Sequence, residues 1–158
     1  MEIPRNWTFE NEEVANGFDK HVREQLPWYD LATDALKHIA RHYIPEDGIV
    51  YDIGASTGNI GRALAPVIQA RNAKLIAIEP SKEMCKIYNA PGEVFCSKAE
   101  NFDFDAFDLA VLFLCLMFIE PRKRIQLMNV LRLNCRPGGA IIVFDKLEPK
   151  GGYISTIL

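Results

Sequence analysis

Glycines and an acidic residue lie together in one short stretch of the chain, Tyr51 to Gly61. Asp52 stands two residues before Gly54, and Gly58 follows after three further residues, which gives the pattern D-x-G-x-x-x-G. Glycine lets a ligand approach the backbone closely, and a loop between a strand and a helix presents backbone N–H groups to it. The stretch therefore predicts a site for a small ligand held partly by the backbone.

The spacing of this loop discriminates among ligands. A phosphate-binding P-loop needs Gly-Lys-Ser/Thr, but Asn59 follows Gly58. A dinucleotide fingerprint, G-x-G-x-x-G, needs glycine where Ser56 stands. A carboxylate at Asp52 would repel a pyrophosphate, whereas it suits a ligand that carries an ammonium and a sulfonium group. The pattern thus favours S-adenosylmethionine over a dinucleotide.

A second acid supports this interpretation. Glu79 ends the next predicted strand, 27 residues after Asp52, where a carboxylate can accept hydrogen bonds from both ribose hydroxyls. Pro80 and Met84 could pack on one face of an adenine, and the loop Ser97–Glu100 could approach the other. The plainer alternatives stay open: the two acids as solvated strand ends, and Met84 as core packing.

Alternating strands and helices must position these residues. Two helices come first, Asn11–Gln25 and about Tyr29–Tyr43. The predicted strands are Ile49–Ile53, Lys74–Glu79, Val94–Cys96, Phe107–Leu114 and Ala140–Phe144, and the helices between them are Asn59 to about Gln69, Ser81–Asn89 and Arg122–Asn134. We expect Pro66 to kink the first of these helices or end it early, and Ile125, Met128 and Leu131 to share the buried side of the last. The order predicts an α/β fold, a Rossmann-like doubly wound, mostly parallel sheet with helices on both faces.

The composition of the chain limits the classes of protein to which it can belong. The chain has 158 residues, 49% of them hydrophobic, with a net charge of -3, which fits one folded domain and excludes intrinsic disorder. The charge argues against a polybasic nucleic-acid or membrane surface, and no apolar run reaches the roughly 18 residues that span a bilayer. We expect a cytoplasmic protein. Its cysteines, Cys85, Cys96, Cys115 and Cys135, form no C-x-x-C pair, which predicts reduced, mostly buried thiols.

The chain resembles the class I S-adenosylmethionine-dependent methyltransferases, and within them the carboxy-S-adenosylmethionine synthase group of tRNA-modification enzymes with its phage and bacterial relatives. The resemblance is carried by Trp7-Thr-Phe9, Val14-Ala15, Phe18, Pro27-Trp-Tyr29, Tyr51-Asp-Ile-Gly54, Ile76-Ala-Ile78, Phe118-Ile-Glu-Pro121 and Pro137-Gly-Gly-Ala140. It implies an S-adenosylmethionine cofactor. Together with the loop pattern, it gives as candidate cofactor-binding residues Tyr29, Asp52, Gly54, Ala55, Ser56, Gly58, Glu79, Pro80, Lys98, Ala99 and Phe113.

Two departures from that group limit what the resemblance implies. Phe113 stands where the synthases have an asparagine, and the chain ends before the arginine that holds the extra carboxylate of their modified cofactor. We therefore expect a methyltransferase acting on an unidentified acceptor, a nucleic acid or a small molecule. A synthase-like enzyme and a non-catalytic cofactor-binding module are the alternatives.

The sequence and the resemblance both bear on domain organisation. The turn at residues 45–48 predicts a boundary between an N-terminal helical cap or lid, residues 1–47, and a cofactor-binding core, residues 48–158. The family usually closes its sheet with two more strands, so we expect the C-terminal strands to be missing from this chain. Otherwise another chain, such as a second copy in a homo-oligomer, would cover the exposed edge of the sheet.

Other residues are weaker candidates for chemistry. His38 and His42 lie four apart on one helix without the glutamate of a zinc-protease motif, so no metal site is expected. Cys115 follows the fourth strand in an apolar context that predicts a buried, inert thiol. The basic residues Arg122 to Arg124 begin a helix, where contact with a nucleic-acid phosphate and ordinary solvation both account for them. The N-terminal aromatics Trp7, Phe9, Phe18, Trp28 and Tyr29 predict a lid over the cofactor, a packing face, or both. No general base stands out, so the catalytic residues are unassigned.

Overall fold

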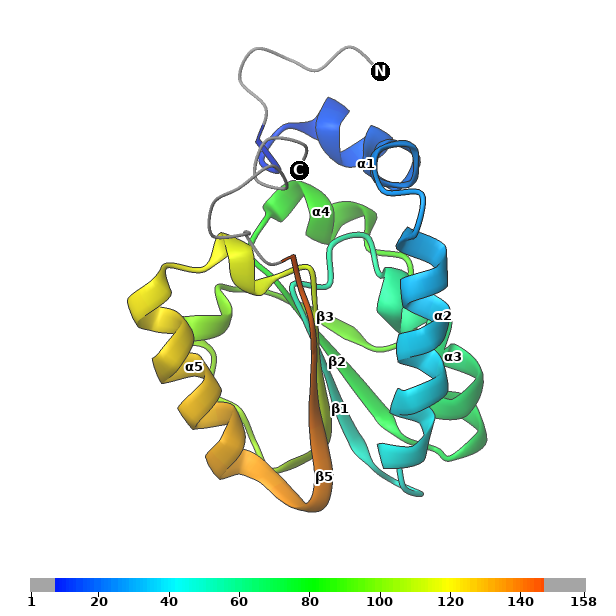
Figure 1. Ribbon diagram of the computed structural model, residues 1–158, viewed down its shortest axis with the longest axis vertical. Coiled ribbons are helices and arrows are strands. Elements are labelled where there is room, and N and C mark those ends of the chain that lie inside the picture. Colours follow the sequence, from blue (N-terminus) through cyan, green and yellow to red (C-terminus); the bar gives the residue numbers. More distant parts are fainter. Residues whose placement is uncertain (1–7, 147–158) are drawn as a thin grey trace, which may run out of the picture.

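A parallel sheet of five strands forms the centre of the computed structural model, which describes residues 8–146 (Figure 1). The strands are β1 (Ile49–Ile53), β2 (Lys74–Glu79), β3 (Glu93–Cys96), β4 (Phe107–Phe113) and β5 (Cys135–Phe144). Their order is β3-β2-β1-β4-β5, and every neighbouring pair is parallel. The chain winds outward from β1 to β3 and then returns to place β4 beside β1, so the predicted doubly wound fold is confirmed.

Helices cover both faces of this sheet. The helices are α1 (Glu12–Gln25), α2 (Tyr29–Ala40), α3 (Asn59–Ala70), α4 (Lys82–Ile87) and α5 (Pro121–Asn134). In Figure 1, α2 and α3 lie on one side of the sheet and α5 on the other, while α1 and α4 lie at the end where the strands finish. The helices α1 and α2 both precede the first strand: α1 lies beyond its carboxyl end, whereas α2 lies against one face of the sheet.

Alternation along the strands explains the two layers. Val50 of β1 and Val111 of β4 belong to the core beneath α2 and α3, whereas Tyr51 and Leu112, one residue further along, belong to the core beneath α5. Successive side chains of a strand point to opposite faces, so a strand buried on both faces is apolar throughout. All seven residues of β4 are buried, and six of them are apolar; the exception, Asp108, pairs with Arg136.

Local capping fixes where the helices begin. The Asn11 side chain accepts hydrogen bonds from the N–H groups of Glu13 and Val14, and the Ser81 hydroxyl accepts one from Met84. These side chains satisfy N–H groups that have no partner within the helix. Pro121 begins α5, where the missing N–H of proline has no consequence. The predicted starts at Asn11, Ser81 and Pro121 are confirmed to within a residue.

The structure corrects several predicted details. Helix α3 continues through Pro66 to Ala70, so the prediction that it would end early is wrong. Helix α4 ends at Ile87 rather than Asn89, and β5 begins at Cys135 rather than Ala140. In α5 the buried residues are Leu127 and Leu131, whereas Ile125 is 68% exposed. Tertiary packing decides these boundaries and faces, which is why a local pattern missed them.

The cysteine prediction is wrong for two residues. Cys85 of α4 and Cys96 at the end of β3 form a disulfide. Their spacing of 11 residues is no recognisable motif, and only the crossover of α4 beside β3 brings the two sulfurs together. Cys115 and Cys135 are free thiols, both partly buried. We expected the C-terminal strands that usually follow β5 to be missing. Residues 147–158, to which this expectation applies, lie outside the described residues.

Candidate functional site

A cavity of about 420 Å³ opens at the carboxyl ends of the strands. The loops after β1, β2, β3 and β4 line it from below, and α1 lines it from above. Ten of the eleven predicted cofactor-binding residues line this cavity: Tyr29, Asp52, Gly54, Ala55, Ser56, Glu79, Pro80, Lys98, Ala99 and Phe113. Open parallel α/β sheets bind ligands at this edge, where neighbouring connections leave toward opposite faces.

Gly58 is the predicted residue that does not line the cavity. It stands before α3 with a φ of 97°, a left-handed conformation that glycine adopts readily. A side chain there would clash with Ala90 and Tyr88 in the connection between α4 and β3. Gly58 therefore has a packing role in the loop, because it lets α3 lie against that connection.

The loop after β1 has a defined backbone shape. Gly54 (φ 73°) and Ser56 (φ 51°) are both left-handed, and the N–H groups of Gly54 and Ala55 donate to the carbonyl of Ile78. This conformation costs a non-glycine residue about 1 kcal/mol or more. At Ser56 it aims the backbone N–H at the Glu79 carboxylate, 2.8 Å away. Ser56, which stands where a dinucleotide fingerprint has its second glycine, thus adopts a left-handed backbone itself.

Glu79 is held from two sides at the end of β2. Its Oε2 accepts the Ser56 N–H, and its Oε1 accepts the Ser81 N–H at 2.9 Å. The side chain is 6% exposed, and this burial raises the pKa of its carboxyl, opposed by the two backbone N–H donors. Each oxygen accepts one bond from the backbone and retains capacity for another. Glu79 is therefore a fixed acceptor facing the cavity.

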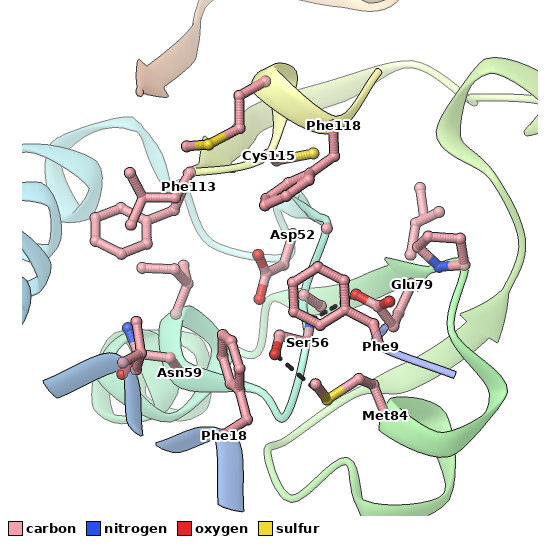
Figure 2. A pocket seen from close by; sticks show the side chains of 18 of the residues that line it. Phe9, Phe18, Asp52, Ser56, Asn59, Glu79, Met84, Phe113, Cys115 and Phe118 are labelled. Atoms are coloured by element: carbon pink, nitrogen blue, oxygen red, sulfur yellow. Dashed lines mark hydrogen bonds between the residues drawn. The ribbon is translucent and has the colours of Figure 1, made fainter. Parts of the chain in front are cut away.

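Asp52 is buried without a full set of partners. It is 1% exposed, and its Oδ2 is the one buried side-chain oxygen or nitrogen that lacks a hydrogen-bond partner within residues 8–146. Burial raises the pKa of this carboxyl to about 7; the Gly61 backbone lowers it, and the Glu79 charge raises it further. In Figure 2 the Asp52 and Glu79 carboxylates point into the same space. Burying a carboxylate without a partner costs free energy, so a positively charged group of a ligand would be stabilised beside Asp52.

Aromatic rings enclose the rest of the cavity. Phe9 packs edge-on against Phe18 and Phe118, with ring centroids 5.7 and 5.3 Å apart. Tyr29 packs edge-on against Phe113 at 5.3 Å. Figure 2 shows the rings of Phe9 and Phe118 beside the two carboxylates. Of the N-terminal aromatics, Phe9, Phe18 and Tyr29 line the cavity, whereas Trp28 packs against Phe144 and the core instead. Trp7 lies outside the described residues.

Sequence reasoning missed part of the lining. His21 and Gln25 of α1 reach the cavity, as do Asn59 of α3, Met117 after β4 and Lys146 after β5. His21 and Gln25 share the helical face of Phe18 and Val22, because residues three and four apart lie on one side. The periodicity used to predict α1 could therefore have found these two residues. No local signal marks the other three.

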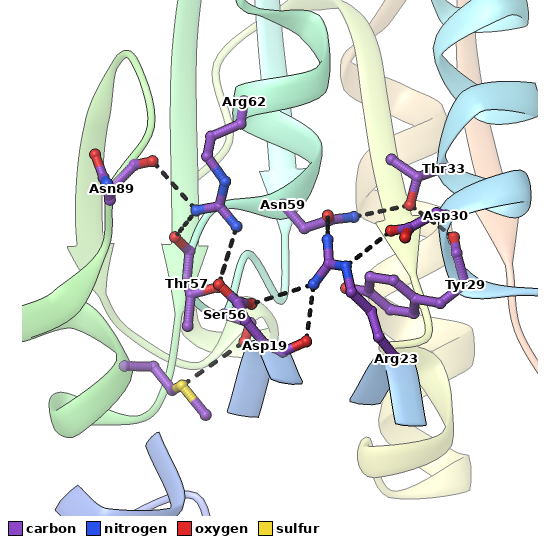
Figure 3. Close-up of polar contacts among 11 residues, drawn as sticks. Asp19, Arg23, Tyr29, Asp30, Thr33, Ser56, Thr57, Asn59, Arg62 and Asn89 are labelled. Atoms are coloured by element: carbon purple, nitrogen blue, oxygen red, sulfur yellow. Dashed lines mark hydrogen bonds and ion pairs between the residues drawn. The ribbon is translucent and has the colours of Figure 1, made fainter. Parts of the chain in front are cut away.

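A polar network anchors α1 to the core (Figure 3). Asp19 accepts a hydrogen bond from the Thr57 hydroxyl at 2.6 Å and pairs with Arg62 at 3.3 Å. Arg62 in turn donates to the carbonyls of Thr57 and Asn89. One turn later, Arg23 donates to the side chains of Asn59 and Asp30. The helix above the cavity is thus tied directly to the glycine loop below it.

The Arg23 guanidinium also approaches the ring of Tyr29, at 5.1 Å from its centroid. Burial of this phenol raises the pKa of Tyr29 to about 12, so it stays protonated at neutral pH. Asn59 donates to the Thr33 hydroxyl at 2.9 Å, which carries the network on to α2. Tyr29 therefore lines the cavity as a neutral phenol and does not act as a base.

The basic residues at the start of α5 have structural partners. Arg124 donates to the carbonyls of Ile119 and Met117, and Lys123 pairs with Glu100 at 3.5 Å. From the other side, Asp145 accepts the N–H of Met117 at 3.1 Å. These contacts clamp the loop that carries Met117 and Phe118 into the cavity. They account for two of the three basic residues without a nucleic acid.

The remaining candidates from the sequence are Cys115 and the pair His38 and His42. Cys115 lines the cavity beside Gly54, and burial raises the pKa of its thiol to about 12, which keeps it protonated. The rings of His38 and His42 lie 6.0 Å apart on α2. Between residues 8 and 146, no group of three potential ligands stands close enough to hold a metal ion.

Fold and site together define a class I methyltransferase fold, with an acidic, glycine-bearing cavity at the carboxyl ends of its strands. Residues 50–139, more than half of the chain, match the family model of the methyltransferase domain. The chain therefore belongs to the methyltransferase domain family.

Named relatives show the same relationship. The chain is similar to a carboxy-S-adenosyl-L-methionine synthase of Pseudoalteromonas atlantica, with 30% identity over 85% of this chain and 59% of the relative. A synthase of the same name from Staphylococcus epidermidis is 29% identical over 92% and 65%. Among solved structures, the S-adenosylmethionine-bound amino pentose methyltransferase CalS10 of Micromonospora echinaspora superposes with a TM-score of 0.65. It shares 17% identity, over 84% of this chain and 57% of that one.

The chain spans 59–65% of the length of these two curated relatives. In the part of the chain that the structure describes, no helix combines the length and apolar character needed to cross a bilayer.

Proposed function

We propose that this chain binds S-adenosylmethionine in the cavity and that the protein transfers its methyl group to an acceptor. One observation carries the proposal: a buried Asp52 carboxylate with an unpartnered oxygen faces a cavity that also holds a fixed Glu79. The ammonium of S-adenosylmethionine would supply the missing partner. Family membership and the named relatives support the same ligand.

The lining residues fit the parts of this cofactor. Asp52 would pair with the ammonium, and Glu79 would accept hydrogen bonds from the ribose hydroxyls. Met84, 1% exposed, and Ala99, 7% exposed, provide apolar surface from two different connections for an adenine. Each role follows from the chemistry of the side chain and from its place in the cavity.

The chain's own residues prepare the reaction by positioning and by excluding water. When bound, S-adenosylmethionine supplies a methyl group on a positively charged sulfur. Phe9, Phe18 and Phe118 limit access of water from the side of α1, while the clamped loop after β4 fixes Met117 and Phe118 beside the cavity. Neither Cys115 nor Tyr29 is ionised at neutral pH, so neither serves as the nucleophile or base.

Calorimetric titration with S-adenosylhomocysteine tests the cofactor proposal. The wild-type protein should bind, and Glu79→Ala should weaken binding at least about tenfold, because hydrogen bonds to a charged group contribute roughly 1.5–3 kcal/mol. Glu79→Gln, which keeps one acceptor for a backbone N–H, should fall between. The exposed Glu46→Gln is the matched control and should bind like the wild type. Absence of binding to the wild type would overturn the proposal.

A second candidate is a carboxy-S-adenosylmethionine synthase-like activity, which the names of the curated relatives favour. Among the described residues, Lys98 and Lys146 are the lysines that line the cavity, and both are exposed, so they would be available to an added carboxylate. Incubation with S-adenosylmethionine and prephenate, followed by mass spectrometry of the bound ligand, distinguishes the two. A carboxylated ligand supports the synthase, whereas an unchanged ligand supports the methyltransferase.

The proposal also covers the methyl acceptor and the cellular location of the protein. We place the protein in the cytoplasm, acting on a small molecule. The contacts of Lys123 and Arg124 leave less basic surface beside the cavity for a nucleic acid. Gel-shift titration with total tRNA and with duplex DNA checks this, because a salt-dependent shift at micromolar protein would contradict it.

A further inference from the structure

The disulfide lies directly behind the cavity. Cys96 is the register partner of Glu79 in the pairing of β2 with β3, and the Sγ of Cys85 lies 3.3 Å from the Glu79 carbonyl. Met84, the neighbour of Cys85, lines the cavity, as do Lys98 and Ala99 just after Cys96. The bond therefore joins the two connections that flank Glu79.

Helix α4 packs against α1, β2 and β3. The helix has six residues, too short to be stable alone, so its place depends on its surroundings. Its cap, Ser81, donates to the Phe9 carbonyl at 2.6 Å, and the Met84 sulfur lies 3.7 Å from the Ser56 hydroxyl. A shift of α4 would therefore reach the lid through Phe9 and the glycine loop through Ser56.

We propose that Cys85 and Cys96 form a reversible redox switch that sets the affinity of the cavity for its cofactor. The oxidised form holds α4 against the end of β3 and binds more tightly; reduction frees α4 and weakens binding. The inference rests on the proposed function, since it concerns the same cavity. Disulfides in a reducing compartment are typically transient and regulatory, which fits a protein placed in the cytoplasm.

The chemistry needs a disulfide oxidant of low molecular weight, such as oxidised glutathione. Cys96 is exposed and Cys85 half-buried, so the Cys96 thiolate attacks first. A mixed disulfide forms and one glutathione thiolate leaves. The Cys85 thiolate then displaces the second glutathione from Cys96. The protein loses two protons and two electrons, and one oxidised glutathione becomes two reduced ones. Excess reduced glutathione reverses both steps.

Binding measured in two redox states tests the switch. The full chain is equilibrated with oxidised or with reduced glutathione and freed of glutathione, and each form is titrated with S-adenosylhomocysteine. We expect the oxidised form to bind about threefold to tenfold more tightly, because it does not have to order α4 on binding. Alkylation under denaturing conditions with mass spectrometry should trap two free thiols in the oxidised form and four in the reduced form.

Variants separate the switch from other effects of oxidation. Cys85→Ser and Cys96→Ser should each bind like the reduced wild type in both conditions. Cys135→Ser is the matched control, because Cys135 lies outside the cavity and the disulfide, and it should keep the full redox response. Equal affinities of the two wild-type forms, or four free thiols after oxidation, would overturn the switch alone. Absence of binding in both redox states would instead overturn the proposed cofactor site.

Discussion

At the scale of single residues, the environment of each carboxylate decides its role. Asp52 and Glu79 are both acidic strand-end residues in the sequence, and both are buried in the structure. Glu79 has a backbone donor on each oxygen, whereas Asp52 keeps an unpartnered oxygen. Glu79 is therefore a fixed acceptor for neutral hydroxyls. Burial raises the pKa of Asp52 to about 7, so this carboxyl ionises fully at neutral pH only when a cation pairs with it.

Gly54 gives a residue-scale prediction. Its left-handed φ of 73° disfavours a side chain, and a Cβ there would lie 2.6 Å from the Cys115 sulfur. Gly54→Ala should lower the free energy of unfolding by about 2 kcal/mol or more, or roughly 4 °C or more in Tm. Gly138→Ala is the matched control, because Gly138 is also left-handed (φ 85°) but nothing lies within 4 Å of its added Cβ.

Thermal unfolding of both glycine variants measures the backbone and steric contributions separately. Gly138→Ala should lose about 1 kcal/mol, the cost of the left-handed conformation alone. A loss in Gly54→Ala no larger than in Gly138→Ala would show that the loop and Cys115 move apart without cost.

At the scale of elements, α1 connects lid and loop. Asp19 joins α1 to Thr57 and Arg62, so the helix above the cavity and the loop below it move together. Asp19→Ala should loosen α1 and speed the dissociation of S-adenosylhomocysteine by about threefold to tenfold, since a partly exposed charged hydrogen bond contributes around 1 kcal/mol. Stopped-flow dissociation measures this rate.

Lys20→Ala provides the comparison for the lid. Lys20 is the neighbour of Asp19 on α1, and its side chain is 83% exposed with one partner, Glu24, on the same helix. Its removal should leave the dissociation rate within about twofold of the wild type. If both variants behave alike, the anchoring of α1 through Asp19 does not control ligand release.

The helices and strands also show which structural features a local sequence pattern can predict. The strands β1 and β2 have the predicted ends, because apolar runs bounded by turn residues mark them clearly. The exposed Ile125 shows the opposite case, since which side of α5 meets the sheet depends on the approach of the helix. Likewise, Pro66 lies inside α3 because packing of Leu64 and Ile68 holds the helix together across the lost hydrogen bond.

At the scale of the whole molecule, Asp52 couples stability to pH. Its pKa is about 7 when folded and near the ordinary 3.8 when unfolded, so between these values the folded protein binds more protons. Stability of the free protein should therefore fall as pH rises from about 4 to about 7. Burial also raises the pKa of Glu79, which adds a contribution of the same sign.

Ligand binding should show the opposite dependence on pH. The ammonium of S-adenosylhomocysteine pairs with the ionised carboxylate, so Kd should approach a tenfold rise per unit as pH falls below about 7. Asp52→Asn should bind weakly, without this dependence, and should unfold at a higher temperature than the ligand-free wild type at about pH 8. Calorimetry and thermal unfolding between about pH 6 and about pH 8 check both. A Kd that is constant across this range would contradict the raised pKa.

The order of residues along the chain was enough to determine the alternation of strands and helices, the glycine loop and most of the cavity lining. These features depend on local periodicity and on the rule that parallel strands end at one edge. Packing alone decided which residues from separate elements meet. It placed Gly58 against the connection between α4 and β3 rather than in the cavity lining, and it brought Cys85 and Cys96 close enough to form a disulfide. It also let Arg124 hold the loop after β4, and it left one oxygen of Asp52 without a hydrogen-bond partner. Contacts between segments distant in the chain depend on how the elements pack, and no local pattern records that.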